Sequence, residues 1–355
     1  MRIALLTIWH IGNYGAELQA YATYKILQQL GHDVIIIDLR EDQSSNESLK
    51  TKIARFISKF TLANYKFERF WRKYLPNKTI YYKNIEQLKN TPPQADMYLV
   101  GSDQVWNYDI TKEKAEVYFL NFGSNNIKRV SFASSFGKNQ WNAPSYITEI
   151  AQRMFPQFSK ISCRETSGLD ILKNTFNIEA NIVIDPTLLF RGYPEFTGNN
   201  IKQRQTLVYY PLSDNEKLCQ FSRKIANELG LKPINSNKKI KLTNTIAWNR
   251  NSIEKWIRDI AQASFVITPS FHGLAFSLIY KKQFIIINNN INQQRKTRMI
   301  DLLERLNLSD RFFESEEDAE IAKPWLKPID YSKVTPILEQ YREESITYLK
   351  KISEL

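Results

Sequence analysis

Short apolar runs alternate with longer helical segments along this chain, and that alternation restricts the possible folds more than any other feature. Near the N-terminus, IALLTI and DVIIIDL are typical of buried strands, and AELQAYATYKILQQL between them has a helical period that ends at Gly31. A strand, helix, strand order predicts a parallel sheet, because parallel neighbours need a crossover connection. We therefore expect an α/β protein.

A second block of this kind starts at TLVYYPL, residues 206–212, and ends in the strands FVITPS and QFIIIN. The stretch 190–205 between the blocks is rich in Gly, Pro, Asn and Gln, which is typical of a linker. A chain of 355 residues suits two domains with a ligand-binding cleft between them. We predict an N-terminal domain at 1–195, a C-terminal domain at 205–330, and a helix at 336–355 that packs back across both, with its proline in the first turn.

The formal charge of +12 favours an anionic partner, and the excess is concentrated in one segment. Between Lys50 and Lys78 there are nine basic residues and one acidic residue, Glu68. Apolar residues repeat there at helical spacing, which fits either amphipathic helices on an anionic membrane surface or surface helices packed on the core. They are Ile53, Phe56, Ile57, Phe60, Phe67, Phe70, Trp71 and Tyr74. No nucleic-acid-binding module accompanies the charge, so we expect no nucleic acid partner.

The two cysteines, Cys163 and Cys219, lie far apart and outside any Cys-x-x-Cys pattern. The sequence therefore predicts neither a disulfide framework nor a zinc site, and it fits a reducing cytoplasm. The opening MRIALLTI has one basic residue and an apolar run too short for a signal peptide or a membrane span. We expect a cytoplasmic protein that needs no metal and no organic cofactor.

Polar and small residues follow the first predicted strand, at the edge where a parallel sheet presents groups to a ligand. In the turn IWHIGNYGAELQA, Gly12 and Gly15 let backbone N–H groups approach a ligand, and Asn13 and Tyr14 lie between them. Glycine in such a turn more often serves backbone geometry than binding, so this pattern alone leaves both interpretations open. His10 we interpret as an ordinary residue.

The segment DMYLVGSDQVWN places Asp103, Gln104 and Trp106 directly after another predicted strand. A carboxylate, an amide and an indole together are typical of a sugar site, where polar groups bind hydroxyls and an aromatic face covers the ring. In the alternative interpretation Asp103 caps a helix and Trp106 belongs to the core. The two interpretations weigh about equally on these residues.

Arg164 follows a strand in KISCRETSG, just before a predicted helix. A guanidinium there offers a rigid fork for a carboxylate or phosphate, beside helix-terminal N–H groups that also favour anions. The alternative is a structural salt bridge with Glu165 or another acid.

His272 lies between the strand FVITPS and a helix of small residues, with Ser270 available as the helix cap. An imidazole at the mouth of a parallel sheet faces ligand rather than core, which favours a role in chemistry. Further along, three cations stand at the start of a helix, where the helix dipole disfavours them unless an anion binds or solvent covers them. These cations are Arg295, Lys296 and Arg298.

Taken in order, the segments GNYGAELQAYA, VGSDQVWN, SFASSFG, ISCRETSG, DPTLL and SFHGLAFSLIYKKQF resemble the polysaccharide pyruvyl transferase family. The resemblance runs from about Ile8 to Arg311. It implies a glycosyltransferase-B fold of two Rossmann-like domains with the active site in the cleft between them. It also implies transfer of pyruvate from phosphoenolpyruvate onto a sugar as a cyclic ketal. The chain departs from the family at Pro269, where an acid is common.

The resemblance implies that Arg164 and His272 are catalytic and bind phosphoenolpyruvate, with Ser270 beside them. For a third cation Arg298 is preferred over Lys296 and Arg295. The acceptor sugar is expected against the first domain. Its candidate contacts are Asn13, Tyr14, Gly15, Asp103, Gln104 and Trp106.

A lipid-linked acceptor would explain the basic aromatic segment, which would then hold the enzyme at the inner face of the membrane. Two other classes of function stay open on the sequence. One is a sugar-nucleotide-dependent glycosyltransferase of the same architecture, and the other is a non-catalytic carbohydrate-binding protein.

Overall fold

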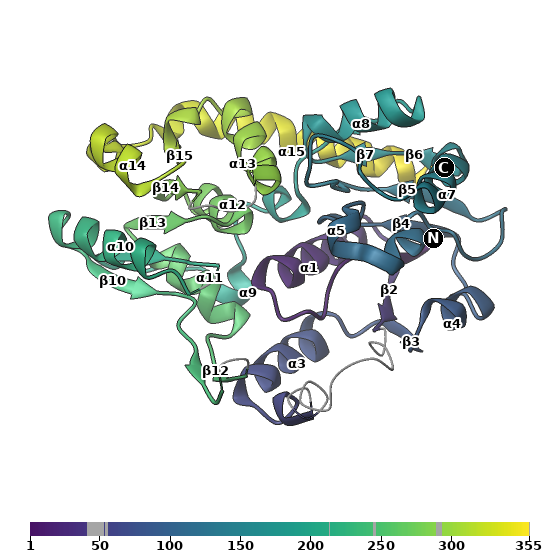
Figure 1. Ribbon diagram of the computed structural model, residues 1–355, viewed down its shortest axis with the longest axis horizontal. Helices are drawn as coiled ribbons and strands as arrows, with labels where there is room; N and C mark the ends of the chain where they lie inside the picture. Colours follow the sequence, from purple (N-terminus) through teal and green to yellow (C-terminus); the bar gives the residue numbers. More distant parts are fainter. Residues whose placement is uncertain (41–52, 54–55, 213, 244–245, 289–292, 355) are drawn as a thin grey trace. The chain divides into compact units, whose positions relative to one another are not determined.

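The computed structural model describes residues 1–40, 53, 56–212, 214–243, 246–288 and 293–354, without the side chains of 293–295. The chain divides into two compact units. Unit 1 comprises Met1–Ser45, Trp71–Leu189 and Glu339–Leu355, and unit 2 comprises Asn46–Phe70 and Phe190–Leu338. Each unit is a parallel α/β structure, labelled in Figure 1.

Unit 1 is built on a six-stranded sheet in the order β3-β2-β1-β4-β5-β6, and every neighbouring pair is parallel. Four of the five residues of β1 are buried, because this strand lies inside the sheet with helices near it. The strands are β1 (Arg2–Leu6), β2 (Asp33–Leu39), β3 (Lys78–Tyr82), β4 (Met97–Val100), β5 (Lys128–Ser131) and β6 (Phe158–Lys160). Two short parallel strands, β7 (Ser162–Cys163) and β8 (Asn181–Ile182), form a separate pair.

Helix α1 (Tyr14–Gln29) shows how local sequence sets the ends of an element in unit 1. The side-chain oxygen of Asn13 accepts the backbone N–H groups of Gly15 and Ala16 at 2.9 and 3.3 Å and so caps its first turn. Beyond its last turn the chain turns at Gly31, whose φ of 87° suits a residue without Cβ. The other helices of unit 1 are α4 (Ile85–Asn90), α5 (Tyr108–Thr111), α6 (Ala115–Tyr118), α7 (Ser145–Met154) and α8 (Thr166–Phe176).

Unit 2 has a five-stranded parallel sheet in the order β10-β9-β13-β14-β15, and an antiparallel hairpin. The sheet strands are β9 (Thr206–Tyr209), β10 (Lys232–Asn235), β13 (Phe265–Thr268), β14 (Gln283–Ile287) and β15 (Phe312–Phe313). The hairpin is β11 (Ile240–Lys241) with β12 (Ala247–Asn249). The helices are α9 (Pro194–Thr197), α10 (Glu216–Glu228), α11 (Ile253–Gln262), α12 (Phe271–Ile279), α13 (Gln293–Arg305) and α14 (Glu316–Ala322).

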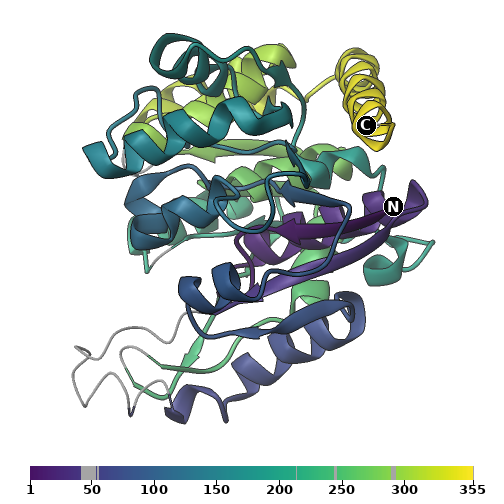
Figure 2. The same cartoon turned by 90° about the vertical axis from the view of Figure 1, so that its right-hand side faces the viewer.

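Two helices continue from one unit into the other along the chain. Helix α3 (Leu62–Tyr74) belongs to unit 2 up to Phe70 and to unit 1 from Trp71. Helix α15 (Tyr331–Ser353) is a single continuous rod that ends close to the C-terminus in Figure 2. Short 3₁₀ helices occur at Lys112–Lys114, Phe155–Gln157, Pro186–Leu189, Ser309–Arg311 and Pro324–Leu326.

The structure differs from the sequence prediction in where α15 begins. The helix starts at Tyr331, so Pro336 lies inside it rather than in its first turn. Asp330 accepts the backbone N–H of Ser332 at 3.0 Å, and this side chain allows an earlier start than the proline suggested.

Two segments also group differently from the predicted domains. The part of the basic segment up to Phe70 belongs to unit 2, whereas the prediction placed it in the N-terminal domain. Its Lys50, Lys52 and Arg55 lie outside the described residues. The predicted linker at 190–205 packs into unit 2, because its Tyr193 is fully buried and packs on Phe276 of α12 with ring centroids 5.4 Å apart.

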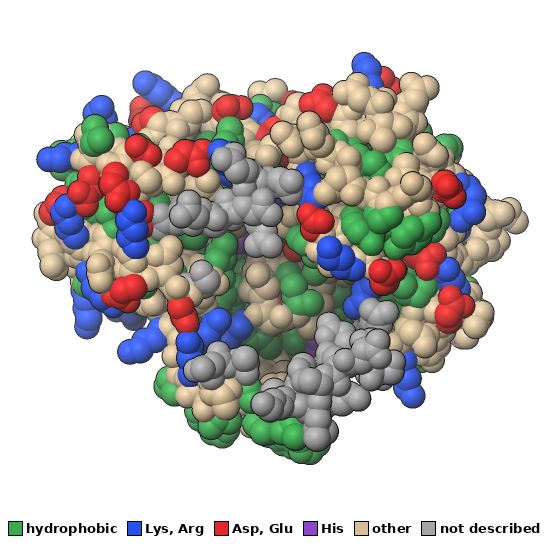
Figure 3. Space-filling model, in the orientation of Figure 1, with side chains coloured by type: hydrophobic (Ala, Val, Ile, Leu, Met, Phe, Trp, Pro, Cys, Tyr) green, Lys and Arg blue, Asp and Glu red, His purple; other side chains and the backbone are tan. Residues whose placement is uncertain are grey.

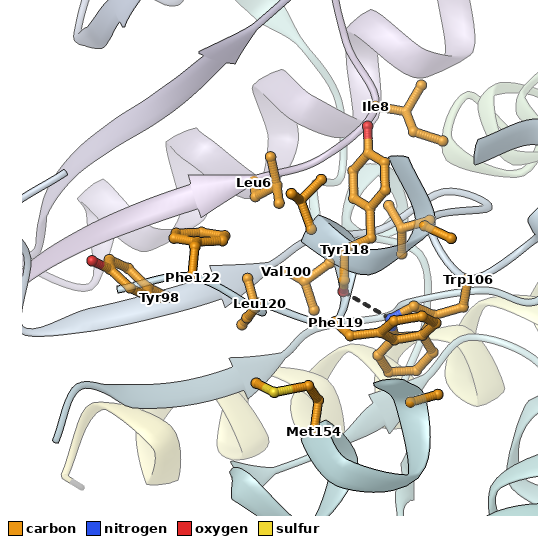
Figure 4. Packing of buried hydrophobic residues seen from close by; sticks show 14 of the residues in the cluster. Leu6, Ile8, Tyr98, Val100, Trp106, Tyr118, Phe119, Leu120, Phe122 and Met154 are labelled. Carbon is orange, nitrogen blue, oxygen red and sulfur yellow. Dashed lines mark hydrogen bonds between the residues drawn. The ribbon is translucent and has the colours of Figure 1, made fainter. Parts of the chain in front are cut away.

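The core of unit 1 contains a large aromatic group around Trp106, shown in Figure 4. The indole is 2 % exposed and packs against the rings of Phe136 and Phe155, with centroids 5.2 and 5.1 Å away. Its Nε1–H donates a hydrogen bond to the carbonyl oxygen of Tyr118 at 3.0 Å, so the one polar atom of the side chain is satisfied. Trp106 is therefore a core residue, which corrects its prediction as a contact for a sugar.

This position gives a prediction for stability. Trp106→Ala should lower the free energy of unfolding by about 3 to 5 kcal/mol, because a large buried side chain leaves a cavity. Trp248→Ala, at an indole that is 43 % exposed, should cost less than about 1 kcal/mol. Urea unfolding followed by circular dichroism measures both, and equal losses at the two sites would contradict the assignment.

Candidate active site

The turn between β1 and α1 in unit 1 is held by one buried carboxylate, Glu17. Its two oxygens accept the backbone N–H groups of His10, Ile11 and Gly12 at 3.0 to 3.1 Å. They also accept the indole N–H of Trp71 at 2.7 Å. Four donors on one side chain fix the turn that follows the central strand, at the carboxyl edge where parallel sheets bind ligands.

His10 lies in that turn in a conformation that is uncommon for a residue with Cβ, with φ of 62°. Its imidazole stacks on the indole of Trp71, with ring centroids 3.4 Å apart and an interplanar angle of 26°. Burial, and then the positive charge of Arg40, lower the pKa of His10 to about 3. The ring is therefore neutral near pH 7, and it lies in a turn whose left-handed backbone is uncommon for a residue with Cβ.

Glu17 itself has an unusual ionisation. Burial raises its pKa to about 7, although all four hydrogen bonds act in the opposite direction by favouring the carboxylate. This role of Glu17 was not identified from the sequence, because one of its donors comes from a helix more than fifty residues away.

A second buried cluster in unit 1 surrounds Arg164, which follows β7. Its Nη1 lies 2.5 Å from Oδ2 of Asp185 and its Nη2 lies 3.2 Å from Oδ1 of Asp103. Its Nε lies 3.8 Å from Oε2 of Glu165, and its Nη1 also donates to the hydroxyl of Ser102 at 3.1 Å. The guanidinium is fully buried.

The charge balance of this cluster decides between the two interpretations of Arg164. Burial by itself lowers the pKa of the guanidinium, but Asp185, Asp103 and Glu165 outweigh it and leave the pKa raised. The structural salt bridge that the sequence left open is therefore present, and with more acids than expected. A guanidinium that already faces three carboxylates is poorly suited to bind an anion directly, so this geometry favours a structural role for Arg164.

The predicted acceptor contacts in unit 1 fall into two groups. Asn13 is exposed and caps α1, and the side chain of Asp103 is partly exposed beside Arg164. Tyr14 and Gly15 are buried, and Gln104 accepts a hydrogen bond from the side-chain amide of Asn107 at 2.9 Å. Asp103 has φ of 76°, so the turn after β4 is held in a conformation that L residues rarely adopt.

In unit 2, His272 lies where the sequence predicted, between a strand and a helix. Strand β13 ends at Thr268, and the hydroxyl of Ser270 caps α12 by accepting the N–H of Gly273 at 3.3 Å. A Cβ on Gly273 would lie 2.6 Å from the side chain of Thr268, so only glycine lets the helix approach the strand this closely. This approach positions His272 in the first turn of the helix, at the carboxyl edge of the sheet.

The three candidate cations on α13 differ in their surroundings. The guanidinium of Arg298 lies 5.5 Å from the centroid of the Phe271 ring, which packs edge-on against His272 with centroids 5.3 Å apart. Lys296 instead forms an ion pair with Glu314 at 2.5 Å. The side chain of Arg295 lies outside the described residues. Arg298 and His272 thus share Phe271 as an aromatic neighbour, whereas Lys296 pairs with Glu314.

Among the residues that the structure describes, no three His, Cys, Asp or Glu side chains are grouped as a metal site requires. Near the end of β13, unit 2 brings together an imidazole, a guanidinium and the capping serine hydroxyl.

The model of the polysaccharide pyruvyl transferase family matches residues 13–291 of the chain. The chain belongs to this family. The match begins at Asn13, the cap of α1, and includes the Arg164 cluster and the His272 helix. It ends just before α13, so the family model does not extend to Arg298. No curated protein is similar enough in sequence to count as a relative.

Solved structures with a similar fold include enzymes of sugar-nucleotide chemistry. UDP-N-acetylglucosamine 2-epimerase from Rickettsia bellii has 9% identity and a TM-score of 0.56, with 100% of this chain and 96% of the epimerase covered. S. aureus MnaA, solved with UDP, has 11% identity and a TM-score of 0.55, with 100% and 98% covered. The glycotransferase of kitacinnamycin has 9% identity and a TM-score of 0.50, with 99% and 98% covered. At such identities the likeness concerns the fold alone, and it confirms the predicted glycosyltransferase-B architecture of two Rossmann-like domains.

The buried carboxyl of Glu17 predicts a pH dependence of stability. Its pKa is about 7 in the folded protein and near 4.5 in an unfolded chain, so between these values the native state holds a proton that the unfolded state has lost. The free energy of unfolding should therefore fall as pH rises through this window, by about 3 kcal/mol in total.

Glu17→Gln removes this ionisation, so the stability of the wild-type protein relative to the variant should decline from pH 4.5 to about 7. The difference between the two proteins is the quantity to compare, because the depressed pKa of His10 acts in the opposite direction. Glu149→Gln, at an exposed residue of α7, is the matched control and should show no such trend. Parallel curves for wild type and Glu17→Gln would exclude a proton on Glu17.

Proposed function

We propose that this protein transfers the pyruvyl group of phosphoenolpyruvate onto two hydroxyls of a sugar as a cyclic ketal and releases phosphate. Membership of the polysaccharide pyruvyl transferase family supports the reaction class. The observation that carries the proposal is that His272 and Arg298 both contact Phe271, next to the carboxyl end of β13.

The donor is a small anion with a carboxylate and a phosphate, so its site needs fixed positive charge and hydrogen-bond donors. Arg298 supplies a guanidinium that rests against an aromatic ring and is 8 % exposed, which limits its competition with water. The N-terminal turn of α12 lies beside it, and helix N-termini favour anions. We assign Arg298, Ser270 and His272 to the donor site and leave Lys296 to its pair with Glu314.

The reaction balances without an added reactant. A proton adds to C3 of the enol and leaves an oxocarbenium-like centre at C2, which one sugar hydroxyl attacks. The C2–O bond to phosphate then breaks, a second hydroxyl attacks the same carbon and the ketal closes. One hydroxyl proton replaces the proton given to C3, and the other leaves with phosphate. His272 is the side chain suited to move these protons, because an imidazole can gain and lose one near neutral pH.

In unit 1, Asn13 and Asp103 are the predicted acceptor contacts that keep exposed surface. Both follow strands of the parallel sheet, β1 and β4, which pair with each other. Neutral His10 lies in the same turn as Asn13 and adds a hydrogen-bonding ring that the sequence prediction had set aside. We place the acceptor sugar at this edge of unit 1, with Arg164 holding the turn of Asp103 in position.

The acceptor we propose is a sugar of a cell-surface polysaccharide or of its lipid-linked precursor, handled on the cytoplasmic side of the membrane. Across the described residues, none of the helices combines the length and apolar character that crossing a bilayer requires. We propose that the basic aromatic segment makes a peripheral contact with lipid, because it combines cations with aromatic side chains.

The direct test is release of phosphate from phosphoenolpyruvate in the presence of galactosides, mannosides and their lipid-linked forms, with the ketal identified by mass spectrometry. Thermal shifts with phosphoenolpyruvate and with UDP-sugars distinguish the proposal from a sugar-nucleotide-dependent transferase. Stabilisation by a UDP-sugar alone, with no phosphate released for any acceptor, would overturn it.

His272, Arg298 and Lys296 give a graded prediction. His272→Ala should lower kcat by about 100-fold or more, because it removes the proton-transfer group. Arg298→Ala should raise KM for phosphoenolpyruvate by about 10-fold or more, the loss expected for one charge-assisted contact. Lys296→Ala should change KM less than about threefold, because its ammonium is engaged by Glu314.

Steady-state phosphate release measures these constants, and circular dichroism checks that each variant folds. A Lys296→Ala protein with a larger effect on KM than Arg298→Ala would contradict the assignment of the donor cation.

A further inference from the structure

Two segments of unit 2 expose large apolar side chains to solvent. In the first, at residues 56–65, Phe56 is 63 % exposed and Phe60 is 69 % exposed. Their rings pack on each other with centroids 5.2 Å apart, so they form one exposed aromatic pair. In the second, the β11–β12 hairpin region at 238–250, Trp248 is 43 % exposed. Ile57, Leu62, Tyr65, Ile240 and Leu242 add further exposed apolar surface.

These segments lie far apart in sequence but are in contact. The ammonium of Lys66 donates to the side-chain oxygen of Asn249 at 2.7 Å and to the carbonyl oxygen of Arg250 at 2.8 Å. The guanidinium of Arg250 lies 3.8 Å from the ring centroid of Phe67. Lys66 and Phe67 thus join α3 to the residues at the end of the hairpin within unit 2. We call residues 56–66, 238–243 and 246–250 together the aromatic-basic surface.

The position of the buried side chains shows that the exposed ones are not simply part of the core. Further along α3, Phe67 and Phe70 are 2 % and 0 % exposed, and Phe70 packs on Phe196 with centroids 5.7 Å apart. The apolar residues of the basic segment thus divide into two groups, with the later ones packed and Phe56 and Phe60 facing solvent. In Figure 3, hydrophobic side chains gather at the lower rim, where α3 and the hairpin lie in Figure 1, with Lys and Arg beside them.

The charges on this surface are almost all positive. Exposed cations flank the aromatic side chains in both segments, and the sequence has no Asp or Glu within residues 56–66 or 238–250. Glu68 and Glu254 follow shortly after the two stretches. The exposed cations are Lys59, Lys238, Lys239 and Lys241. Lys241 is paired with Asp214 at 2.5 Å, which leaves a net positive surface. Exposed aromatic groups among cations are the combination that binds an anionic lipid interface.

We propose that the aromatic-basic surface docks unit 2 onto an anionic membrane, with Phe56, Phe60 and Trp248 entering the interface and the lysines contacting lipid phosphates. The helical segment by itself suggested such contact from sequence, and the structure adds the hairpin at 238–250 as its second half. Binding to the membrane does not depend on the reaction. Its use, delivery of the enzyme to a lipid-linked acceptor, rests on the proposed function.

The test is co-sedimentation of the full-length protein with vesicles of phosphatidylcholine alone and with vesicles that also contain phosphatidylglycerol. The wild-type protein should bind the anionic vesicles at least about 10-fold more tightly, and added salt should weaken this binding. Phe56→Ser/Phe60→Ser/Trp248→Ser should lose about 10-fold or more in affinity. Lys238→Glu/Lys239→Glu should lose a similar factor, mainly on anionic vesicles.

The matched control variants carry the same kinds of substitution at exposed residues outside the aromatic-basic surface. Ile321→Ser/Leu326→Ser removes two side chains that are 84 % and 65 % exposed, and Lys327→Glu/Lys350→Glu reverses two exposed charges. Both controls should bind vesicles like the wild-type protein. Phosphate release with a water-soluble acceptor should be unchanged in all these variants, which shows that they fold and that the surface lies outside the reaction site.

Three outcomes would overturn the proposal: no preference of the wild-type protein for anionic vesicles, equal losses in the control variants, or a dimer that the aromatic variant dissociates without any vesicle binding. The last result would assign the surface to a second copy of the chain. Specific vesicle binding without any release of phosphate from phosphoenolpyruvate would leave the surface supported and the proposed function refuted.

Discussion

A single buried guanidinium holds together the strand ends that form the ligand edge of unit 1. Arg164 follows β7 and pairs with Asp103 after β4 and Asp185 after β8, and Glu165 lies at its Nε. Burying any one of these charges alone would be strongly unfavourable, so each requires the others and the loops that carry them. This arrangement places three carboxylates around one cation, so the cluster carries an excess of negative charge. The ligand edge of unit 1 is therefore built from mutually dependent turns rather than from independent loops.

The turn after β1 is likewise held by one buried ionisable side chain, that of Glu17. Its carboxyl is desolvated by burial, yet it accepts four hydrogen bonds. Three come from the backbone N–H groups of His10, Ile11 and Gly12 and fix the conformation of the turn, and the fourth comes from Trp71. The resulting turn carries a left-handed histidine stacked on Trp71, a strained conformation that persists because its surroundings hold it. In unit 2, the position of His272 depends on close packing instead. Gly273 has no Cβ, so α12 can lie against Thr268, and this contact positions His272.

Much of the fold followed from local sequence, and so did part of the candidate site. The strands IALLTI, DVIIIDL and FVITPS and the helix that ends at Gly31 are confirmed because apolar period and glycine act over a few residues. His272 and its cap Ser270 lie at the predicted junction for the same reason. The start of α15 was wrong, because the side chain of Asp330 allows the helix to begin before its proline. The interpretation of Trp106 as a sugar contact was wrong, because its core neighbours come from α7, a 3₁₀ turn and the loop after β5.

The sequence by itself determined the parallel α/β architecture, the ends of α1 and the junctions at which candidate residues stand, since these depend on neighbours along the chain. Only the tertiary structure decided which candidates pair with acids and which are buried. Arg164 forms ion pairs with acids that follow other strands, and Lys296 pairs with Glu314. Glu17 accepts a hydrogen bond from the indole of Trp71 on α3. Desolvation and pairing are set by atoms that arrive from distant segments, and the linear order of residues does not contain those distances.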